Sequence, residues 1–451
     1  MSAKSLRRFS GPAWLALAAT LAGAALRYLG LLTLPPPAWV DEIWFALRAR
    51  EILQTGQFPI FYKTFWGGVN PLLAWLTAGA QWLAFRDVSV SSRVVSATFS
   101  VLAVPLFFAA LDEFWRAELP APRRRWLAAL ASLALAFFFS TITLTRLGTE
   151  PGVALAAGLF CLWQQRRAAR TGARLSFALA GLGVGAAQYL SPHARFIPVL
   201  MVLWGLHDLA LAPAGQRRRL LGGLALAAAV AALSAAPLIA FFVREPEWFL
   251  GRARAVTAAA GSQGLLAFWL TNAGKLALAF SWAGDPSGRD NLAGRPYLDV
   301  VQSLGFYLGL GLTLWRARRS ARARDLLVWL AVMLAPSLVT DDAPSFSRLI
   351  QLAPPALALT VLGWNALWTA RPAWLGRAAA AGVAGLALAV SLAGNVADYF
   401  GRFAQQPDLA AWYTATPVRL AQDLIARAPA EAVFVERVLE AEDIFAFDFL
   451  F

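Results

Sequence analysis

The feature that most constrains this chain is a series of apolar runs, each separated from the next by a short polar segment that is often rich in arginine. A helix that crosses a bilayer needs about 17–25 mainly apolar residues. This length predicts eleven spans, at 13–34, 94–115, 126–144, 151–165, 175–190, 196–212, 219–243, 298–316, 325–340, 347–369 and 375–396. The apolar share of 59% and the mean hydropathy of +0.57 also exceed those of ordinary soluble domains. We therefore expect an all-α polytopic membrane protein.

The distribution of Lys and Arg predicts the orientation, because positively charged loops stay on the cytoplasmic side. Half of the basic residues, 21 of 40, lie in the six segments 1–12, 116–125, 166–174, 213–219, 316–325 and 371–377. The longer segments 35–93 and 244–297 and the tail from 398 hold most of the acidic residues and fall outside. The sequence thus predicts a cytoplasmic N-terminus in an inner or plasma membrane.

The apolar segment 71–85 disturbs this alternation if it is counted as a span. Arg7 and Arg8 precede the first span, and the Arg123–Arg125 triplet follows the second. Both groups favour the cytoplasm, which requires an even number of crossings between them. We therefore predict that 71–85 lies at the outer membrane surface. The alternative, in which it spans, would move the triplet outside.

The predicted organisation is a transmembrane domain over 1–397, with a first outer loop at 35–93, followed by a short extracytoplasmic segment at 398–451. The strand-like ending of that segment is compatible with a shortened C-terminal domain. The net charge of +14 is explained by topology rather than by nucleic acid, since the loops are too short for a reading surface. The single Cys161 excludes an intramolecular disulfide, and two histidines, His193 and His207, exclude a histidine-rich metal site.

Asp41 and Glu42 are the most informative candidates for chemistry. They follow three prolines that end the first span, and they open a short amphipathic helix at the outer surface. A carboxylate pair there lies close to the lipid headgroups. The alternative is that Asp41 only complements the helix dipole.

Other ionisable residues are predicted to lie at the same outer face. They are Lys63, Arg146, Glu150, Arg195 and, with less support, Lys275. Ionisable groups at membrane depth are costly and often mark function. Glu150 could instead serve as a helix-start residue and Arg195 could extend to the interface, but their convergence favours a common site.

Four motifs then carry a family resemblance. They are "ILQTGQFPIFYKTFWGGVNPLLAW" after the acidic pair, "TRLGTEPGVALAAGLF", "REPEWF" at 244–249 and "DDAPSFSRLIQLAPPALAL" at 341–359. Their order and spacing resemble the GT-C glycosyltransferases, in the bacterial branch that contains the lipid A aminoarabinose transferases and is related to protein O-mannosyltransferases. The resemblance covers the chain to about residue 400 and implies a GT-C bundle with juxtamembrane helices in the first outer loop.

The resemblance implies transfer of a sugar from a polyprenyl-phosphate donor to a lipid, glycan or protein acceptor at the outer face. Asp41 would be the general base of an inverting reaction. Glu42 and Glu150 would complete the catalytic set, with Glu150 orienting the acceptor or the sugar. Lys63, Arg146, Arg195 and Lys275 would bind the donor phosphate. Two departures, Glu150 in place of an aspartate and Thr64 in place of a proline, leave donor and acceptor open.

No metal or other cofactor is expected, although a divalent cation on the acidic pair is an alternative. Two other functions compete with the enzyme. A transporter would place polar or broken-helix sites near the bilayer midplane, whereas the predicted spans are nearly uncharged apart from Arg27. A membrane scaffold would not depend on the carboxylate of Asp41.

Overall fold

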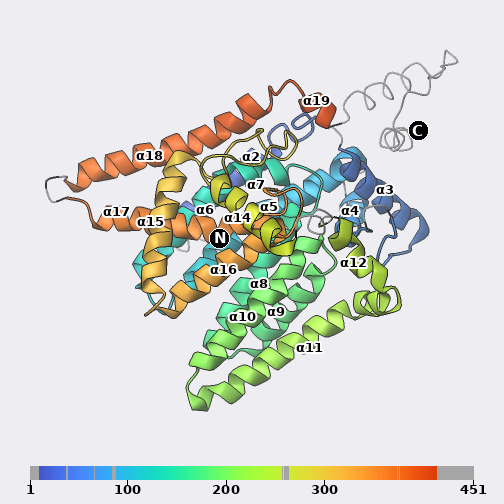
Figure 1. Ribbon diagram of the computed structural model, residues 1–451, viewed down its shortest axis with the longest axis horizontal. Helices are drawn as coiled ribbons and strands as arrows, with labels where there is room; N and C mark the ends of the chain where they lie inside the picture. The colour runs from blue at the N-terminus through green and yellow to red at the C-terminus, as the bar shows by residue number, and fades with distance from the viewer. Residues whose placement is uncertain are drawn as a thin grey trace, which may run out of the picture.

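The computed structural model describes residues 10–36, 39–64, 67–83, 88–255, 257, 264–372, 374 and 376–413. These residues form helices and a single isolated bridge between Tyr62 and Val69 (Figure 1). The helices are α2 (Gly11–Tyr28), α3 (Val40–Thr55), α4 (Leu72–Leu83), α5 (Val88–Phe114), α6 (Ala121–Phe137), α7 (Phe139–Thr145), α8 (Pro151–Thr171), α9 (Arg174–Ala187), η1 (Pro192–Arg195), α10 (Phe196–Leu211), α11 (Ala214–Arg244), α12 (Pro246–Ala255), α14 (Leu265–Ala279), α15 (Val300–Arg316), α16 (Ala321–Leu338), η2 (Ile350–Leu352), α17 (Ala353–Thr369), α18 (Arg377–Ala397), η3 (Asp398–Phe403) and α19 (Leu409–Trp412).

The all-α membrane fold is confirmed, and each of the predicted spans overlaps a helix. By length and apolar composition, five helices in the described part of the chain could cross a bilayer, or six when the bent pair α6 and α7 counts as one. The number of eleven spans therefore stays a prediction.

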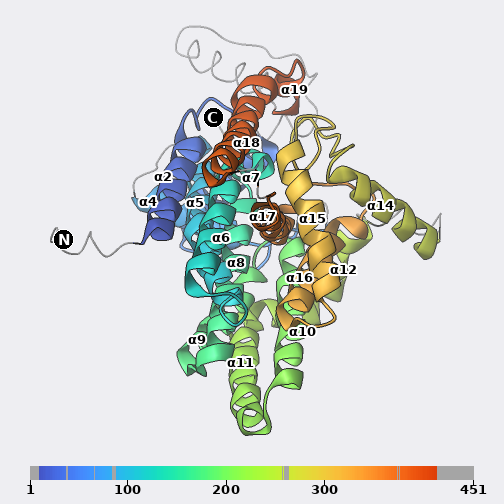
Figure 2. The same cartoon turned by 90° about the vertical axis from the view of Figure 1, so that its left-hand side faces the viewer.

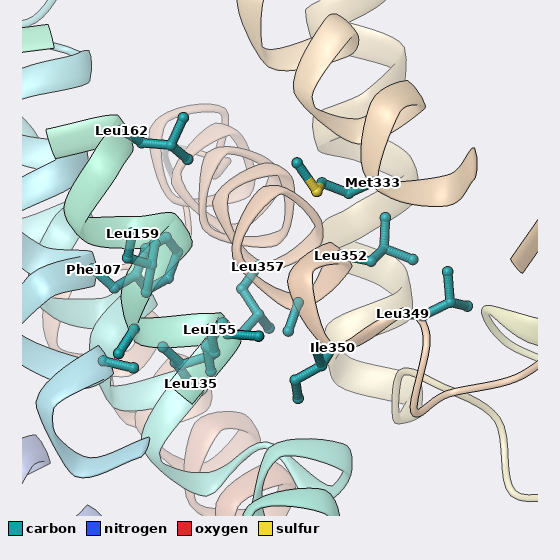
Figure 3. Packing of buried hydrophobic residues seen from close by; sticks show 14 of the residues in the cluster. Phe107, Leu135, Leu155, Leu159, Leu162, Met333, Leu349, Ile350, Leu352 and Leu357 are labelled. Atoms are coloured by element: carbon teal, nitrogen blue, oxygen red, sulfur yellow. The ribbon is translucent and has the colours of Figure 1, made fainter. Parts of the chain in front are cut away.

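The helix α17 occupies the middle of the bundle. The span at Ile350–Thr369 is 72% buried, whereas the spans that contain α11 and α18 are 11% and 17% buried. Leu357 of α17 and Ile350 of η2 pack among leucines of α6 and α8, and Met333 of α16 belongs to the same cluster (Figure 3). The peripheral helices α11 and α18 instead present apolar side chains outward, as helices do in contact with lipid.

Close helix packing in this core depends on glycine. A Cβ atom added at Gly309 of α15 would lie 1.9 Å from the Leu359 carbonyl oxygen of α17. One added at Gly363 of α17 would lie 1.9 Å from the Gly305 carbonyl oxygen of α15. Small residues let membrane helices approach to backbone contact, which increases their van der Waals attraction. The α15–α17 pair uses this arrangement.

The predicted span at 126–144 is broken, because α6 and α7 meet at Phe138 with a bend of 52°. Arg27 of α2 donates hydrogen bonds to the Ala136 and Leu135 carbonyls at this break, where the Leu135 carbonyl also accepts from the Phe138 backbone N–H. Thr141 also donates to the Leu135 carbonyl. A side chain inserted into the hydrogen-bond ladder is an established cause of a kink. The buried Arg27 is thus a structural residue of this bend.

Two features outside the long helices bear on the topology. The segment predicted to lie at the outer surface contains α4, whose 12 residues extend about 18 Å and fall short of a bilayer core of about 30 Å. The helix α14, by contrast, was not predicted, because 244–297 was interpreted as an outer segment.

The two ends of the bundle differ in character. Figure 2 places α19 at one end and the turn between α10 and α11 at the opposite end. The first end also holds loop 280–299, which hydrogen-bonds Gln406, between η3 and α19, and Tyr413, directly after α19. The strand-like ending of the chain belongs to residues 414–451, which lie outside the described residues.

Candidate active site

A cavity of about 880 Å³ lies at the end of the bundle that holds α19. The helices contribute apolar lining residues, among them Leu144 of α7, Phe196 and Val199 of α10, and Pro336 of α16. The loops and helix starts contribute charged lining residues, which are Asp41, Glu150, Arg195, Asp285, Arg289, Asp290, Asp342 and Arg348. One cavity therefore offers both an apolar wall and a charged wall.

Asp41 lies in the first turn of α3 and lines this cavity. Its side chain is exposed, and Oδ2 accepts a hydrogen bond of 3.0 Å from the Trp39 indole nitrogen. A carboxylate at a helix N-terminus is stabilised by the helix dipole. Asp41 is thus accessible while one of its oxygens is oriented by Trp39, as a general base requires.

Glu42 follows directly but points elsewhere, because successive helical residues differ by about 100° around the axis. Its side chain is fully buried and accepts from Arg93 Nε and Nη2 at 2.8 Å each. It also accepts from the backbone nitrogens of Trp39 at 2.9 Å and Gly148 at 2.7 Å. Glu42 does not line the cavity. It ties the start of α3 to the segment before Glu150, which makes it a positioning residue.

Glu150 and Arg195 share the cavity with Asp41. Glu150 precedes α8, and Arg195 ends η1 at the start of α10. The Arg195 guanidinium donates to the Phe249 carbonyl at 3.0 Å and lies 4.5 Å from the centre of the Phe249 ring. This packing holds the cation beside the cavity and leaves further donors of its guanidinium for a ligand.

The three other predicted phosphate ligands lie outside the cavity lining. Arg146 is fully buried, and its guanidinium donates to the Leu26, Arg27 and Leu34 carbonyls and to the Tyr399 hydroxyl. Lys63 forms an ion pair of 2.6 Å with Glu245. Lys275 is exposed on α14. These cations are therefore engaged in the fold or separate from the site.

Sequence reasoning did not find the charged residues of loop 280–299. Arg289 pairs with Asp290 through two contacts of 2.6 and 2.7 Å, and its guanidinium lies 4.8 Å from the Trp39 ring centre. Trp39 in turn donates to Asp41, so this loop and the candidate base are joined through one indole. The polar segment "GDPSGRDN" carries no helical or strand periodicity, so no pattern signalled its position.

Asp285 connects this loop with the later outer loop. Its carboxylate accepts from the backbone nitrogens of Ser287 at 2.8 Å and Phe346 at 2.7 Å. Burial is the largest influence on this carboxyl and raises its pKa to about 6. The pKa of Arg289 is also raised: burial lowers it, but the carboxylates of Asp290 and Asp41 favour the charged guanidinium and outweigh burial. The cavity therefore holds an anionic and cationic network that is partly withdrawn from water.

Asp342 and Arg348 were also missed as site residues, although they belong to the quoted motif at 341–359. They form an ion pair of 2.9 Å. His193, whose ring accepts or donates at the Ser191 hydroxyl, lines the same cavity. The signal that could have found Arg348 was its place in a motif already assigned to an outer loop.

The described residues contain no group of three or more His, Cys, Asp or Glu side chains placed to hold a metal ion. The alternative cation site on Asp41 and Glu42 would compete with Arg93, because both Glu42 oxygens already accept from its guanidinium. The expectation that the reaction needs no cofactor stays a prediction.

Comparisons with known proteins agree with this architecture. Residues 56–242 match the family model described as dolichyl-phosphate-mannose-protein mannosyltransferase. No curated protein matches the chain. The chain resembles the crystal structure of ArnT from Cupriavidus metallidurans bound to undecaprenyl phosphate, with a TM-score of 0.59 and 14% identity over 97% of this chain and 85% of that chain.

It also resembles the apo oligosaccharyltransferase of Archaeoglobus fulgidus, with a TM-score of 0.59 and 14% identity over 99% of this chain and 64% of that chain. The same enzyme tethered to an acceptor peptide gives a TM-score of 0.55 at 14% identity, over 98% of this chain and 59% of that chain. The chain thus spans just under two thirds of that enzyme. It has the fold of the GT-C membrane glycosyltransferases, the superfamily that its sequence resembles.

Proposed function

We propose that this protein is a membrane glycosyltransferase that transfers a sugar from a polyprenyl-phosphate donor to an acceptor at the extracytoplasmic face. The observation that carries the proposal is the joint placement of Asp41, Glu150 and two arginines, Arg195 and Arg348, around one cavity with an apolar wall. A lipid-linked sugar phosphate needs an apolar surface for its first isoprene units, cations for its phosphate and a base for the acceptor. The apolar lining residues, the two arginines and Asp41 meet these three needs in turn.

In the proposed reaction, Asp41 takes the proton from the acceptor hydroxyl as its oxygen attacks the anomeric carbon of the sugar. The bond between that carbon and the phosphate oxygen breaks on the opposite face, and its electron pair leaves on the lipid phosphate. The configuration at the anomeric carbon is therefore inverted. Arg195 and Arg348 stabilise the added negative charge of the departing phosphate, because charge-assisted hydrogen bonds are strongest where charge develops.

The remaining charged groups have orienting roles in this proposal. Glu150 accepts hydrogen bonds from hydroxyls of the sugar or of the acceptor. Glu42 and Arg93 fix the start of α3, so that Asp41 keeps its orientation. The similar ArnT structure holds undecaprenyl phosphate, a lipid of the proposed donor class, which supports this choice of donor. Mass spectrometry of the product, described below, would identify the sugar and the class of acceptor, whether lipid, glycan or protein.

The test begins with mass spectrometry of surface glycans and membrane lipids from cells with and without the protein, which identifies the product. Asp41→Asn is then compared with wild type in proteoliposomes. General-base catalysis contributes about 10²–10⁴-fold, so we expect kcat to fall at least about 100-fold. Binding of undecaprenyl phosphate, measured by thermal shift, should be retained because the asparagine side chain has nearly the same shape as that of aspartate.

The matched control is Asp408→Asn, which changes an exposed aspartate on the same side of the protein outside the cavity lining. Its turnover should stay within about twofold of wild type. Equal turnover of the Asp41 variant and wild type would exclude Asp41 as the base. An unchanged glycan and lipid profile in cells that lack the protein would count against the transferase itself.

A further inference from the structure

A second recess, of about 260 Å³, lies at the end of the bundle remote from α19. Its lining comes from the C-terminal ends of α5, α8 and α10 and from the N-terminal parts of α9, α11 and α16. The turn between α10 and α11 marks this end in Figure 2. These helix ends are the segments that the Lys and Arg distribution predicts to be cytoplasmic. The recess shares no lining residue with the candidate active site.

Arginine dominates this lining, and the recess is therefore called the basic recess. Two carboxylates face five guanidinium groups, and the residues are Glu113, Asp208, Arg116, Arg166, Arg170, Arg219 and Arg322. The carboxylates are shared. Asp208 contacts Arg166 at 3.0 Å and Arg322 at 3.3 Å, while Glu113 contacts both Arg116 and Arg170.

The nearby acids do not remove the excess positive charge. Asp325 lies 3.4 Å from Arg166 and 2.6 Å from Arg322, and it also binds His207. Asp112 contacts Arg116 at 3.0 Å, so with Asp325 and Asp112 counted, four carboxylates stand against the five arginines of the lining. Arg219 has no ion pair among the described residues, and its side chain lies against Gly172.

Arg166 anchors the recess from within. It is 3% exposed, and its guanidinium lies 3.9 Å from the Trp204 ring centre. Only Nη1 is hydrogen-bonded within the described residues, whereas Nε and Nη2 are buried without a partner. Burying a guanidinium with unsatisfied donors is costly, so an anion nearby would stabilise it.

The wall of the basic recess also has an apolar part, formed by Phe177, Leu211 and Leu220. From Leu220 onward, α11 continues along the bundle with an apolar and largely exposed surface. Arginine forks match phosphate geometry, and basic pockets between transmembrane helices at the cytoplasmic side bind phospholipid headgroups. An acyl chain beside α11 and a phosphate among the arginines would occupy both parts at once.

We propose that the basic recess binds the phosphate of an anionic phospholipid from the leaflet opposite to the active site. A soluble phosphate would use the same guanidinium groups but not the apolar wall, and the structure therefore favours the lipid. The inference is independent of the proposed transferase activity, because it concerns different residues at the other end of the molecule.

The test uses the full-length protein in zwitterionic detergent, with phosphatidylglycerol, phosphatidylcholine and inorganic phosphate as separate probes. Native mass spectrometry measures retained lipid, and thermal unfolding measures stabilisation by each probe. Wild type should retain phosphatidylglycerol in preference to phosphatidylcholine and should be stabilised by it. Arg170→Gln/Arg219→Gln should weaken this binding by about 30-fold, because each arginine contributes about fivefold to the attraction of an anionic lipid.

The matched control is Arg174→Gln/Arg218→Gln, which removes the same charge from exposed positions at the same end outside the recess lining. It should bind phosphatidylglycerol as wild type does. The single variant Arg219→Gln breaks no ion pair among the described residues, and it tests the site if the double variant does not fold. An equal loss of phosphatidylglycerol binding in both double variants would show that the overall positive charge, and not the recess, attracts the lipid, and would overturn the proposal. Equal stabilisation by inorganic phosphate would overturn the lipid assignment.

Discussion

The substitution Glu42→Gln tests how the first outer loop is held in place. Glu42 and Arg93 are both almost fully buried, with side chains 0% and 1% exposed. The change removes the negative charge but keeps the size of the side chain. Arg93 then remains as a buried cation, and the new amide group presents donors to groups that are themselves donors. Breaking a buried ion pair from one side costs about 3–5 kcal/mol.

The hydrogen bonds give a consistent magnitude. Glu42 accepts two bonds from Arg93 and one each from the Trp39 and Gly148 backbones. A hydrogen bond to a charged group contributes about 1.5–3 kcal/mol. An amide oxygen can keep some of these bonds, so losing the equivalent of two agrees with a loss of about 3–5 kcal/mol.

The assay is unfolding of the purified protein in mixed micelles, with Glu51→Gln as the control. Glu51 lies on the same helix and forms a 2.6 Å pair with Arg48, but its side chain is 51% exposed. Such surface pairs contribute about 0–1 kcal/mol. Glu42→Gln should therefore unfold at much lower denaturant than Glu51→Gln. If the two variants lose similar stability, the buried ion pair does not hold the loop and the reasoning fails.

Three more expected outcomes concern other parts of the structure. Gly309→Ala should destabilise the bundle in the same unfolding assay, because the added Cβ atom would lie 1.9 Å from a main-chain carbonyl oxygen of α17. Gly311→Ala should be neutral or stabilising, because its added Cβ atom would have no neighbour within 4 Å. The raised pKa of Asp285 means that its protonated form stabilises the fold; this contribution to the free energy of unfolding is fully present below about pH 4 and is lost as pH rises through about 6. The free energy of unfolding should therefore fall by on the order of 3 kcal/mol between pH 4 and pH 8 in wild type but not in Asp285→Asn. Equal pH profiles of the two proteins would contradict this. Arg195→Gln should weaken undecaprenyl-phosphate binding about tenfold, whereas Lys63→Gln should change it less than about threefold, since Arg195 lines the cavity and Lys63 does not. A larger loss of binding in Lys63→Gln than in Arg195→Gln would identify Lys63 as the phosphate ligand.

The helical membrane fold could be predicted because lipid imposes a simple rule, a long apolar run for each crossing. The same rule brought Asp41, Glu150 and Arg195 to one face, since each follows or precedes a predicted span on the outer side. What it could not predict is which neighbour faces the cavity. Asp41 and Glu42 are adjacent in sequence, yet one is exposed and the other is buried against Arg93.

The remaining differences have physical reasons of the same kind. The bend at Phe138 depends on Arg27, which comes from a helix more than 100 residues earlier. The partners of Arg146 are backbone carbonyls, which no sequence pattern marks. Arg289 belongs to an irregular loop and packs on the Trp39 ring, which in turn donates to Asp41. These contacts of the three arginines join residues that are far apart in the sequence. Patterns within one segment of the sequence therefore cannot predict them.

The central place of α17 has a consequence for biogenesis. This helix begins at residue 353, so a ribosome has made α2 to α16 before the segment is available. Until then, the cleft that it fills between α6, α8 and α15 must be occupied by lipid or by a loosely placed neighbour. Chains that stop before α17 should therefore be inserted but remain open to quality-control proteases, so that the persistence of the earlier helices depends on a later one.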